Sequence, residues 1–359
     1  MTLDEWIDIG TSKGIVDDIN FEPVPFCVCF RKWFLMKMGI VKPQSVDRIE
    51  CTYNRYYLLS EFSQKNLHEI YEQTVIDFLN DIITSRGTIS EKEFGRIFQI
   101  VNNVMVYALD LGIGGAKLLN WSLIKRYINT GKIIKNDIRE LAISSADKSR
   151  LFKAVLQDNL YPEKRNACLC LVLNFFLGLR IGELAGLTFS DFDLQSKLVR
   201  IYKTESKYYT RDSEGNKSGS MVYRIQEDTK TMYSVRQVPL VPAAEDILKM
   251  IYEHHNQCGY DSPYLAYDGK GEAVLSRSLS RTLDKLCRLL NLKHINTHKI
   301  RKTFASDLHA AGMSTRNITD LLGHAEMSTT EHCYILSDGN IEKLRREMTT
   351  ALDCDIFDK

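Results

Sequence analysis

The chain has 359 residues, of which 44% are hydrophobic and 26% are charged, as is usual for globular proteins. This length favours two domains over one. The formal net charge is only +1, so a polyanionic partner would have to bind a local basic surface. The charge balance neither proves nor excludes nucleic-acid binding.

Cysteine spacing and local hydropathy argue against several other classes of protein. The nine cysteines include no C-x-x-C pair, so no zinc-site spacing is present and reduced thiols are expected. The apolar run ACLCLVLNFFLGL is too short to span a bilayer, and the acidic start MTLDEWIDIG does not have the basic residues of a signal peptide. We therefore expect a soluble intracellular protein with no membrane contact.

The first half of the chain predicts a short leader followed by a helical module. Residues 1–30 contain Pro23 and Pro25, which discourage regular structure, and are too short for a domain. Residues 31–135 contain several segments of helical periodicity, of which the clearest starts with a capping box at Ser90 and Glu93. The polar segment NTGKIIKNDIRE after this module is interpreted as an interdomain linker.

Basic residues punctuate the first two predicted helices, and Tyr53, Tyr56 and Tyr57 are interleaved with them. A surface that binds nucleic acid has this pattern, but an ordinary solvated helix surface has it too, and the sequence leaves both interpretations open. The candidate DNA-binding residues are Arg31, Lys32, Lys37, Lys42, Arg48 and Arg55.

The second half, residues 136–338, opens with a helix capped by Ser144, and the apolar run follows as a buried helix that ends just before Arg180. An arginine at the end of such a helix needs a fixed anionic partner. Glu183 and a bound phosphate are the two alternatives, and these residues alone do not choose between them.

Segments with strand character follow this helix. LVRIYK, MVYRIQ and VRQVPLV predict a three-stranded antiparallel meander, so the expected fold class is mainly α with a small antiparallel β-sheet. Lys230 falls on the turn between the last two strands. Three other lysines compete with it for any role in chemistry, namely Lys203, Lys207 and Lys217.

The stretch from residue 297 to residue 334 concentrates polar residues at helical spacing. His298 and Arg301 lie three residues apart on a predicted amphipathic helix, so their side chains should share a face. Gly312 suits the left-handed stop after this helix, and Ser314 is placed to cap the next one, which ends at Gly323 and His324.

A third short helix is predicted directly after His324. Ser328 and Glu331 form a capping box of the type S-x-x-E, and Tyr334 follows on the helix that they would start. This prediction places Tyr334 on a short helix that can move.

Two arginines, two histidines, a lysine and a tyrosine, without a carboxylate or Cys/His set for a metal, suggest phosphoryl transfer in which cations stabilise the charge. Arginine can bind a phosphodiester through two parallel hydrogen bonds. The tyrosine hydroxyl, with a pKa near ~10, becomes a competent nucleophile only where positive neighbours stabilise its phenolate. No cofactor is expected.

These residues resemble the motif of the tyrosine recombinases, or phage-type integrases. The motif residues occur in the family's order: Arg180 in LGLRIGEL, Lys230 in TKTMYSVRQVPL, His298 and Arg301 as H-x-x-R, His324 in LLGH, and Tyr334 after STTEHC. The N-terminal helical module more loosely resembles the family's core-type DNA-binding domain. The resemblance covers roughly residues 31–345.

The resemblance implies a site-specific DNA recombinase. Tyr334 would attack the scissile phosphate and form a 3′-phosphotyrosyl link, while Arg180 and Arg301 would clamp the non-bridging oxygens. The other implied roles are protonation of the 5′-hydroxyl leaving group by Lys230, hydrogen bonds to the phosphate from His298 and His324, and orientation of the arginines by Glu183. Neither metal nor ATP would be needed, because the phosphotyrosine conserves the bond energy.

The resemblance also implies domains and partners. Residues 31–135 would bind DNA, residues 136–338 would catalyse, and residues 339–359 would form a tail whose helix packs onto a neighbouring protomer. The implied partners are double-stranded DNA with inverted core repeats, further copies of the chain as a dimer on one site and a tetramer in synapsis, and accessory DNA-bending proteins. The implied location is the bacterial cytoplasm, at the nucleoid.

Two alternatives stay open. A type IB topoisomerase shares the phosphotyrosine step but relaxes supercoils as a monomer, and a catalytically inactive DNA-binding protein could retain the fold. The compact spacing from His324 to Tyr334 favours a recombinase over the first, and the presence of all six motif residues argues against the second.

Overall fold

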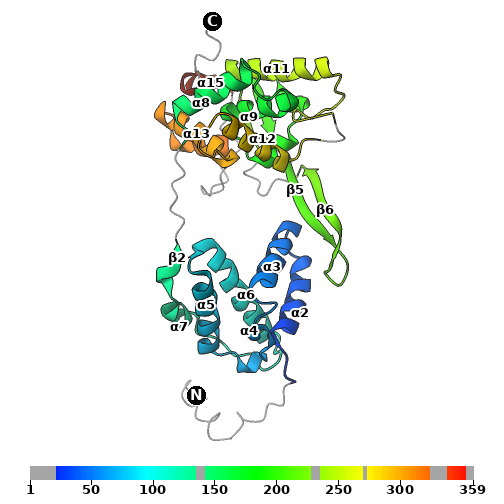
Figure 1. Ribbon diagram of the computed structural model, residues 1–359, viewed down its shortest axis with the longest axis vertical. Coiled ribbons are helices and arrows are strands. Elements are labelled where there is room, and N and C mark those ends of the chain that lie inside the picture. The colour runs from blue at the N-terminus through cyan, green and yellow to red at the C-terminus, as the bar shows by residue number, and fades with distance from the viewer. Residues whose placement is uncertain (1–21, 135–141, 228–234, 270–272, 324–337, 353–359) are drawn as a thin grey trace, which may run out of the picture. The chain divides into compact units, whose positions relative to one another are not determined.

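The computed structural model describes residues 22–134, 142–227, 235–269, 273–323 and 338–352 (Figure 1). The chain divides into two compact units. Unit 1 comprises Met1–Ile138 and Tyr208–Val222, and unit 2 comprises Arg139–Lys207 and Tyr223–Lys359. The predicted fold class, mainly α with small antiparallel sheets, is confirmed. Among the described helices, none is long and apolar enough to cross a membrane.

Unit 1 is built from helices joined by short turns. They are α2 (Phe26–Met38), α3 (Pro43–Tyr56), α4 (Glu61–Gln64), α5 (Glu72–Arg86), α6 (Glu91–Asp110) and α7 (Trp121–Tyr127), with 3₁₀ turns η1 (Leu67–Glu69) and η2 (Thr130–Lys132). The short strand β1 (Ile89–Ser90) pairs in parallel with β2 (Ile133–Ile134). Ser90 caps α6 as predicted, since its Oγ accepts a hydrogen bond from the Glu93 amide at 3.2 Å.

The first helix begins earlier than the sequence pattern predicts. α2 starts at Phe26, because Pro25 occupies the N-cap, where a missing N–H removes no helical hydrogen bond.

Two of the interleaved tyrosines belong to the core and not to a surface. Tyr53 stacks on Phe30 with ring centroids 3.6 Å apart, and the fully buried Tyr57 donates its hydroxyl to the carbonyl of Ile97.

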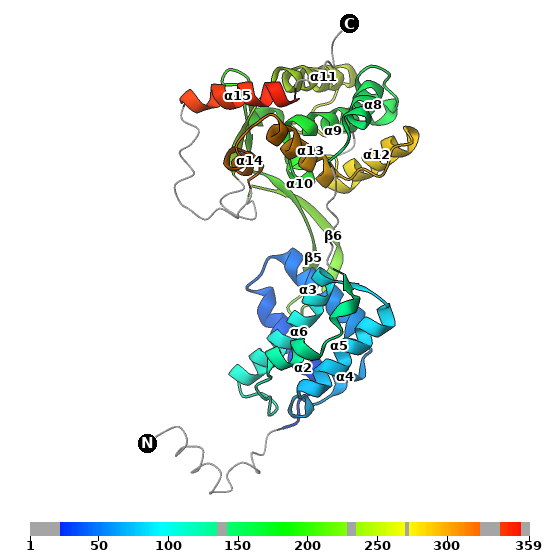
Figure 2. The same ribbon diagram turned by 90° about the vertical axis from the view of Figure 1, so that its left-hand side faces the viewer.

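Unit 2 surrounds one buried helix. Its helices are α8 (Ser145–Leu156), α9 (Arg165–Leu177), α10 (Ile181–Gly186), α11 (Pro242–Cys258), α12 (Ser276–Leu289), α13 (Thr297–Ala310), α14 (Thr315–Leu322) and α15 (Asp338–Leu352), with 3₁₀ turns η3 (Pro162–Lys164) and η4 (Phe189–Asp191). Helix α9, the predicted apolar run, packs against α8, α11, α12 and α13 (Figure 2). Its residues from Asn166 to Leu177 are all buried.

The strands do not form the predicted three-stranded meander. One sheet has the antiparallel order β3 (Phe192–Asp193), β4 (Leu198–Ile201), β7 (Arg236–Pro239), with Ile201 opposite Arg236. The segment MVYRIQ instead lies in β6 (Lys217–Gln226), which pairs with β5 (Thr204–Arg211) in a separate two-stranded sheet. The prediction was wrong because strand periodicity does not specify the partner of a strand.

The outer part of the β5–β6 hairpin belongs to unit 1 and is held there by charge. Arg211 binds Asp47 at 2.6 Å and Glu50 at 2.8 Å, and Lys217 binds Glu50 at 2.8 Å. The polar segment between the strands therefore forms an integral part of unit 1, although the sequence pattern shows only a connection.

The end of α9 requires a glycine. Gly178 adopts the left-handed conformation, with φ +61°, and an added Cβ would lie 2.4 Å from a ring carbon of Phe304 on α13. This close approach lets the carbonyl of Gly178 accept a hydrogen bond from Arg301 at 2.7 Å. The backbone turn and the position of the arginine are thus linked.

We predict that Gly178→Ala lowers the free energy of unfolding by about 3 kcal/mol, from backbone strain and the clash together. The matched control is Gly259→Ala at the end of α11, where φ is +64° but no atom lies within 4 Å of the added Cβ. Strain alone should cost about 1 kcal/mol there. Urea unfolding of both variants measures the difference, and equal losses would contradict the assigned contact.

Candidate active site

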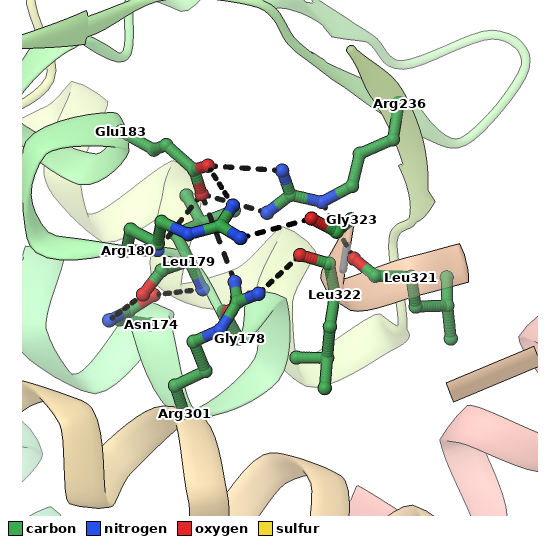
Figure 3. Close-up of polar contacts among 10 residues, drawn as sticks. All are labelled: Asn174, Gly178, Leu179, Arg180, Glu183, Arg236, Arg301, Leu321, Leu322 and Gly323. Atoms are coloured by element: carbon green, nitrogen blue, oxygen red, sulfur yellow. Dashed lines mark hydrogen bonds and ion pairs between the residues drawn. The ribbon is translucent and has the colours of Figure 1, made fainter. Parts of the chain in front are cut away.

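Three arginines from separate parts of unit 2 surround a single carboxylate, that of Glu183 (Figure 3). Arg180 is the N-cap of α10 and Glu183 lies in its first turn. Arg236 is the first residue of β7, and Arg301 lies on α13. The fold therefore brings together side chains that are up to 121 positions apart in the sequence.

Both oxygens of Glu183 are occupied. Oε1 accepts from Nη1 of Arg180 at 2.8 Å and from Nη1 of Arg236 at 3.2 Å. Oε2 accepts from the backbone amide of Arg180 at 2.9 Å and from Nη2 of Arg236 at 2.8 Å. Nη1 of Arg301 lies 3.9 Å from Oε2, within ion-pair range but too far for a hydrogen bond.

The charge of Glu183 is maintained by these neighbours. Burial raises the pKa of its carboxyl group, but Arg236 and Arg180 outweigh burial and hold the pKa below its ordinary value. The carboxylate is thus ionised at neutral pH although the residue is only 3% exposed. A buried charge of this kind is tolerated only with good partners.

Burial and positive neighbours disfavour the charged form of the Arg301 guanidinium. Burial, followed by repulsion from Arg180 and Arg236, lowers its pKa to about 9, and Glu183 opposes the shift. Its terminal nitrogens donate to the carbonyls of Gly178 and Leu322. An anion bound nearby would relieve the repulsion and stabilise the charged form.

The end of α14 supplies the remaining acceptors. Three successive carbonyls each accept from one of the arginines: Leu321 from Nε of Arg236 at 2.7 Å, Leu322 from Arg301, and Gly323 from Nη2 of Arg180 at 3.0 Å. The last carbonyls of a helix have no intrahelical donor and carry partial negative charge, so cations stabilise this end. The arginines thereby fix the point from which the chain continues to His324.

The cluster has the charge of an anion site. Three guanidinium groups face one carboxylate among the described residues, which leaves an excess of two positive charges. Arg180 remains open to solvent, since 43% of its side chain is exposed. Of the two alternatives for Arg180, Glu183 is the partner seen here, and the exposed donors leave a phosphate possible as an additional partner.

The other predicted site residues are placed as follows. His298 is exposed on α13, one turn before Arg301. Lys230, His324 and Tyr334 lie outside the described residues, as does the capping box of Ser328 and Glu331.

Two of the three competing lysines are engaged elsewhere. Lys203 binds Asp191 at 2.9 Å and the hydroxyl of Thr188 at 2.8 Å. Burial lowers the pKa of Lys203, but Asp191 outweighs burial and raises it overall. Lys217 pairs with Glu50 in unit 1, whereas Lys207 is exposed on β5.

Sequence reasoning assigned no role to Arg236. It lies in the segment VRQVPLV, which predicts only a strand. The strand period offered a signal, because Arg236 alternates with Val238 and must share its inward face. A charged residue at an inward position needs a buried partner, and the structure shows Glu183 in that role.

The candidate DNA-binding residues of unit 1 differ in their surroundings. Arg31 donates to Asn216 at 3.0 Å, and Arg55 pairs with Glu93 at 3.0 Å. Lys37 and Arg48, by contrast, line a pocket of about 280 Å³ between α2, α3 and α6. Its lining residues are Trp33, Lys37, Val41, Ser45, Arg48, Ile49, Thr52, Arg96, Gln99, Ile100 and Asn103, so among the described residues it contains three cations and no carboxylate.

Comparisons with known proteins agree with this geometry. The model of the phage integrase family matches residues 143–340, which is more than half of the chain. A tyrosine recombinase XerC-like protein of Caldanaerobacter subterraneus subsp. tengcongensis is 27% identical over 176 residues, covering 45% of this chain and 44% of the relative. The transposase from transposon Tn916 of Enterococcus faecalis is 26% identical over 209 residues, covering 55% and 48%. The chain thus spans about half the length of these relatives.

A solved structure extends the likeness in fold to nearly the whole chain. The integrase of transposon Tn1549, in complex with a circular intermediate DNA, superposes with a TM-score of 0.63 at 16% identity, over 90% of this chain and 94% of that one. At this identity the likeness concerns the fold alone. Together with the matched family model, it leads to one conclusion: the chain belongs to the phage integrase family of tyrosine recombinases.

Proposed function

We propose that this protein is a site-specific DNA recombinase that cleaves and rejoins DNA strands through a 3′-phosphotyrosyl intermediate at Tyr334. The observation that carries the proposal is the excess of two positive charges around Glu183 among the described residues, in a chain that belongs to this family. In phosphoryl transfer the protein mainly positions the reactants and stabilises charge on the non-bridging oxygens. An arginine cluster with exposed donors meets that requirement.

The proposed chemistry exchanges one phosphodiester for another. The Tyr334 oxygen attacks the phosphorus as its proton passes to a neighbouring histidine, His298 or His324. The bond to the 5′-oxygen breaks, and Lys230 donates a proton to that leaving oxygen. Arg180 and Arg301 bind the non-bridging oxygens, with His298 and His324 as further donors. Rejoining reverses these steps with a 5′-hydroxyl from a second duplex, so neither ATP nor a metal ion takes part.

Unit 1 is proposed to hold the DNA through Arg31, Lys32, Lys37, Lys42, Arg48 and Arg55. Phosphate contacts dominate non-specific affinity, and an arginine or lysine whose charge is not offset contributes most to them. Lys37 and Arg48 therefore rank first, together with Arg96 of the same pocket. Arg31 and Arg55 rank lower, because bonds within unit 1 already occupy them.

We also propose a substrate and an assembly. The substrate would be double-stranded DNA with inverted core repeats, with a dimer on each site and a tetramer in synapsis. Accessory DNA-bending proteins would take part, and the reaction would occur in the bacterial cytoplasm. Helix α15 packs on unit 2 of its own chain through the buried Leu344, Met348 and Leu352. We propose that the same surface also accepts α15 from a neighbouring protomer.

The first prediction concerns the nucleophile and the clamp. Tyr334→Phe should abolish covalent capture of a nicked duplex substrate while duplex binding stays intact, because the attacking oxygen is lost. Arg180→Ala and Arg301→Ala should each slow capture by about 10²-fold to 10³-fold, as for a lost oxyanion donor. Denaturing gels measure capture and mobility shifts measure binding.

Other results of the capture and binding measurements would contradict these assignments or favour an alternative function. Capture by Tyr334→Phe would move the nucleophile elsewhere, and near-normal capture by either alanine variant would remove that arginine from the clamp. Relaxation of supercoiled DNA without a core site would favour the topoisomerase, and binding without any capture by the wild-type chain would favour the inactive DNA-binding protein.

The second prediction concerns the basic pocket of unit 1. Lys37→Ala, Arg48→Ala and Arg96→Ala should each weaken binding to all DNA sequences similarly, and should reduce the slope of log affinity against log salt by about 1. Arg55→Ala is the matched control, since Arg55 lies on the same helix as Arg48 but pairs with Glu93. Titrations at several salt concentrations measure the slopes. An equal effect of Arg55→Ala would contradict the ranking.

The third prediction concerns exchange of α15. A chain ending at residue 337 keeps Tyr334 but has no α15, and the full-length Tyr334→Phe variant has α15 but no nucleophile. Mixing the two on a core-site substrate should increase capture by the shortened chain, because α15 can then be donated. Circular dichroism checks that the shortened chain is folded, and capture unaffected by mixing would argue against exchange.

A further inference from the structure

Arg236 is a buried cation that the proposed chemistry does not use. Its side chain is 5% exposed, and it is held on β7 opposite Ile201 of β4. Taking a guanidinium out of water is costly unless its donors are satisfied by a well-aligned partner. Arg236 therefore calls for an explanation in terms of what it binds.

Arg236 binds Glu183 differently from the other two arginines. Its two terminal nitrogens contact both carboxylate oxygens, at 3.2 and 2.8 Å. The side chain of Arg180 contacts Oε1 alone, and Arg301 stays 3.9 Å from Oε2. Arg236 thus forms the two-pronged pair that neutralises the carboxylate most completely.

The same guanidinium also reaches α14. Its Nε donates to the carbonyl of Leu321 at 2.7 Å, beside the carbonyls of Leu322 and Gly323 that accept from Arg301 and Arg180. One side chain therefore ties the first turn of α10 to the last turn of α14. Its loss would leave Glu183 free to attract Arg180 and Arg301 and would leave the Leu321 carbonyl without this donor.

We propose that Arg236 is a positioning residue for strand cleavage: by neutralising Glu183 and anchoring the end of α14, it keeps the positive charge of Arg180 and Arg301 available for the scissile phosphate. The inference rests on the proposed function and deepens it. Arg236 acts through Glu183 and α14, since only 5% of its own side chain is exposed.

Loss of Arg236 should also change the charge of the cluster. Without Arg236, two arginines would face one carboxylate in the described part of the site, and the excess there would fall from two positive charges to one. The backbone amide and side chain of Arg180, and the more distant Arg301, would then be left to counter the effect of burial, so the pKa of Glu183 should rise. Protonation of Glu183 at lower pH, or its replacement by glutamine, would restore the excess of two.

The test measures capture of the nicked duplex and duplex affinity for the wild-type chain, Arg236→Gln, Glu183→Gln and the double variant. Arg236→Gln should slow capture about 10²-fold with affinity changed less than about twofold, since the lost interaction serves the transition state. The ratio of its capture rate to the wild-type rate at the same pH should increase as pH falls from about 8 to about 6, because protonation of Glu183 removes its negative charge. The double variant should capture faster than Arg236→Gln at neutral pH.

Arg200→Gln is the matched control, because Arg200 lies on β4 of the same sheet with its guanidinium over the Tyr202 ring and outside the cluster. It should leave capture unchanged. Arg236→Lys provides a second variant should Arg236→Gln unfold, as followed by urea unfolding. It keeps the charge but loses the fork and the Nε donor, so capture should fall about tenfold with affinity retained.

Three results would overturn the inference: normal capture by Arg236→Lys, no rescue of Arg236→Gln by either low pH or Glu183→Gln, or a loss of affinity that matches the loss of capture. Failure of the proposed function looks different, because the wild-type chain itself would then capture no DNA.

Discussion

The candidate site depends on the interaction between the ionised carboxylate of Glu183 and the three arginines around it. Three guanidinium groups packed this closely would repel one another strongly in a poorly solvated interior. Glu183 offsets one of the three positive charges, and carbonyl groups at the ends of α9 and α14 accept the donors that remain. The residual excess of positive charge is what makes the cluster suitable for a phosphodiester.

The contacts that stabilise the fold of unit 2 also position the residues of the candidate site. Gly178 can end α9 beside Phe304 only because it has no Cβ, and its carbonyl then meets Arg301. The arginines in turn hold the end of α14, so the segment that leads to His324 starts from a fixed point. Packing, helix termination and electrostatics therefore act on the same few atoms, and a change in one affects the others.

In unit 1 some basic side chains pair with carboxylates, whereas others line a pocket without a described carboxylate. Arg211 pairs with Asp47 and Glu50, and Lys217 pairs with Glu50, so the hairpin becomes part of the unit and two positive charges offset two negative ones. Lys37 and Arg48 face a pocket that has no described carboxylate. Whether a basic side chain stabilises the unit or can contact a ligand therefore depends on its pairing with carboxylates, and not on the number of basic residues.

The sequence by itself determined most of the described helices and the caps at Ser90, Ser144 and Ser314, because these depend on neighbours a few positions away. Together with the order of the motif residues, it therefore indicated the family and the mainly helical class. Only the tertiary structure decided the partners of the strands, the burial of Tyr53 and Tyr57, and the place of Arg236. Each of these depends on contacts between residues far apart in the chain, and periodicity shows that a residue points inward without showing what it meets there.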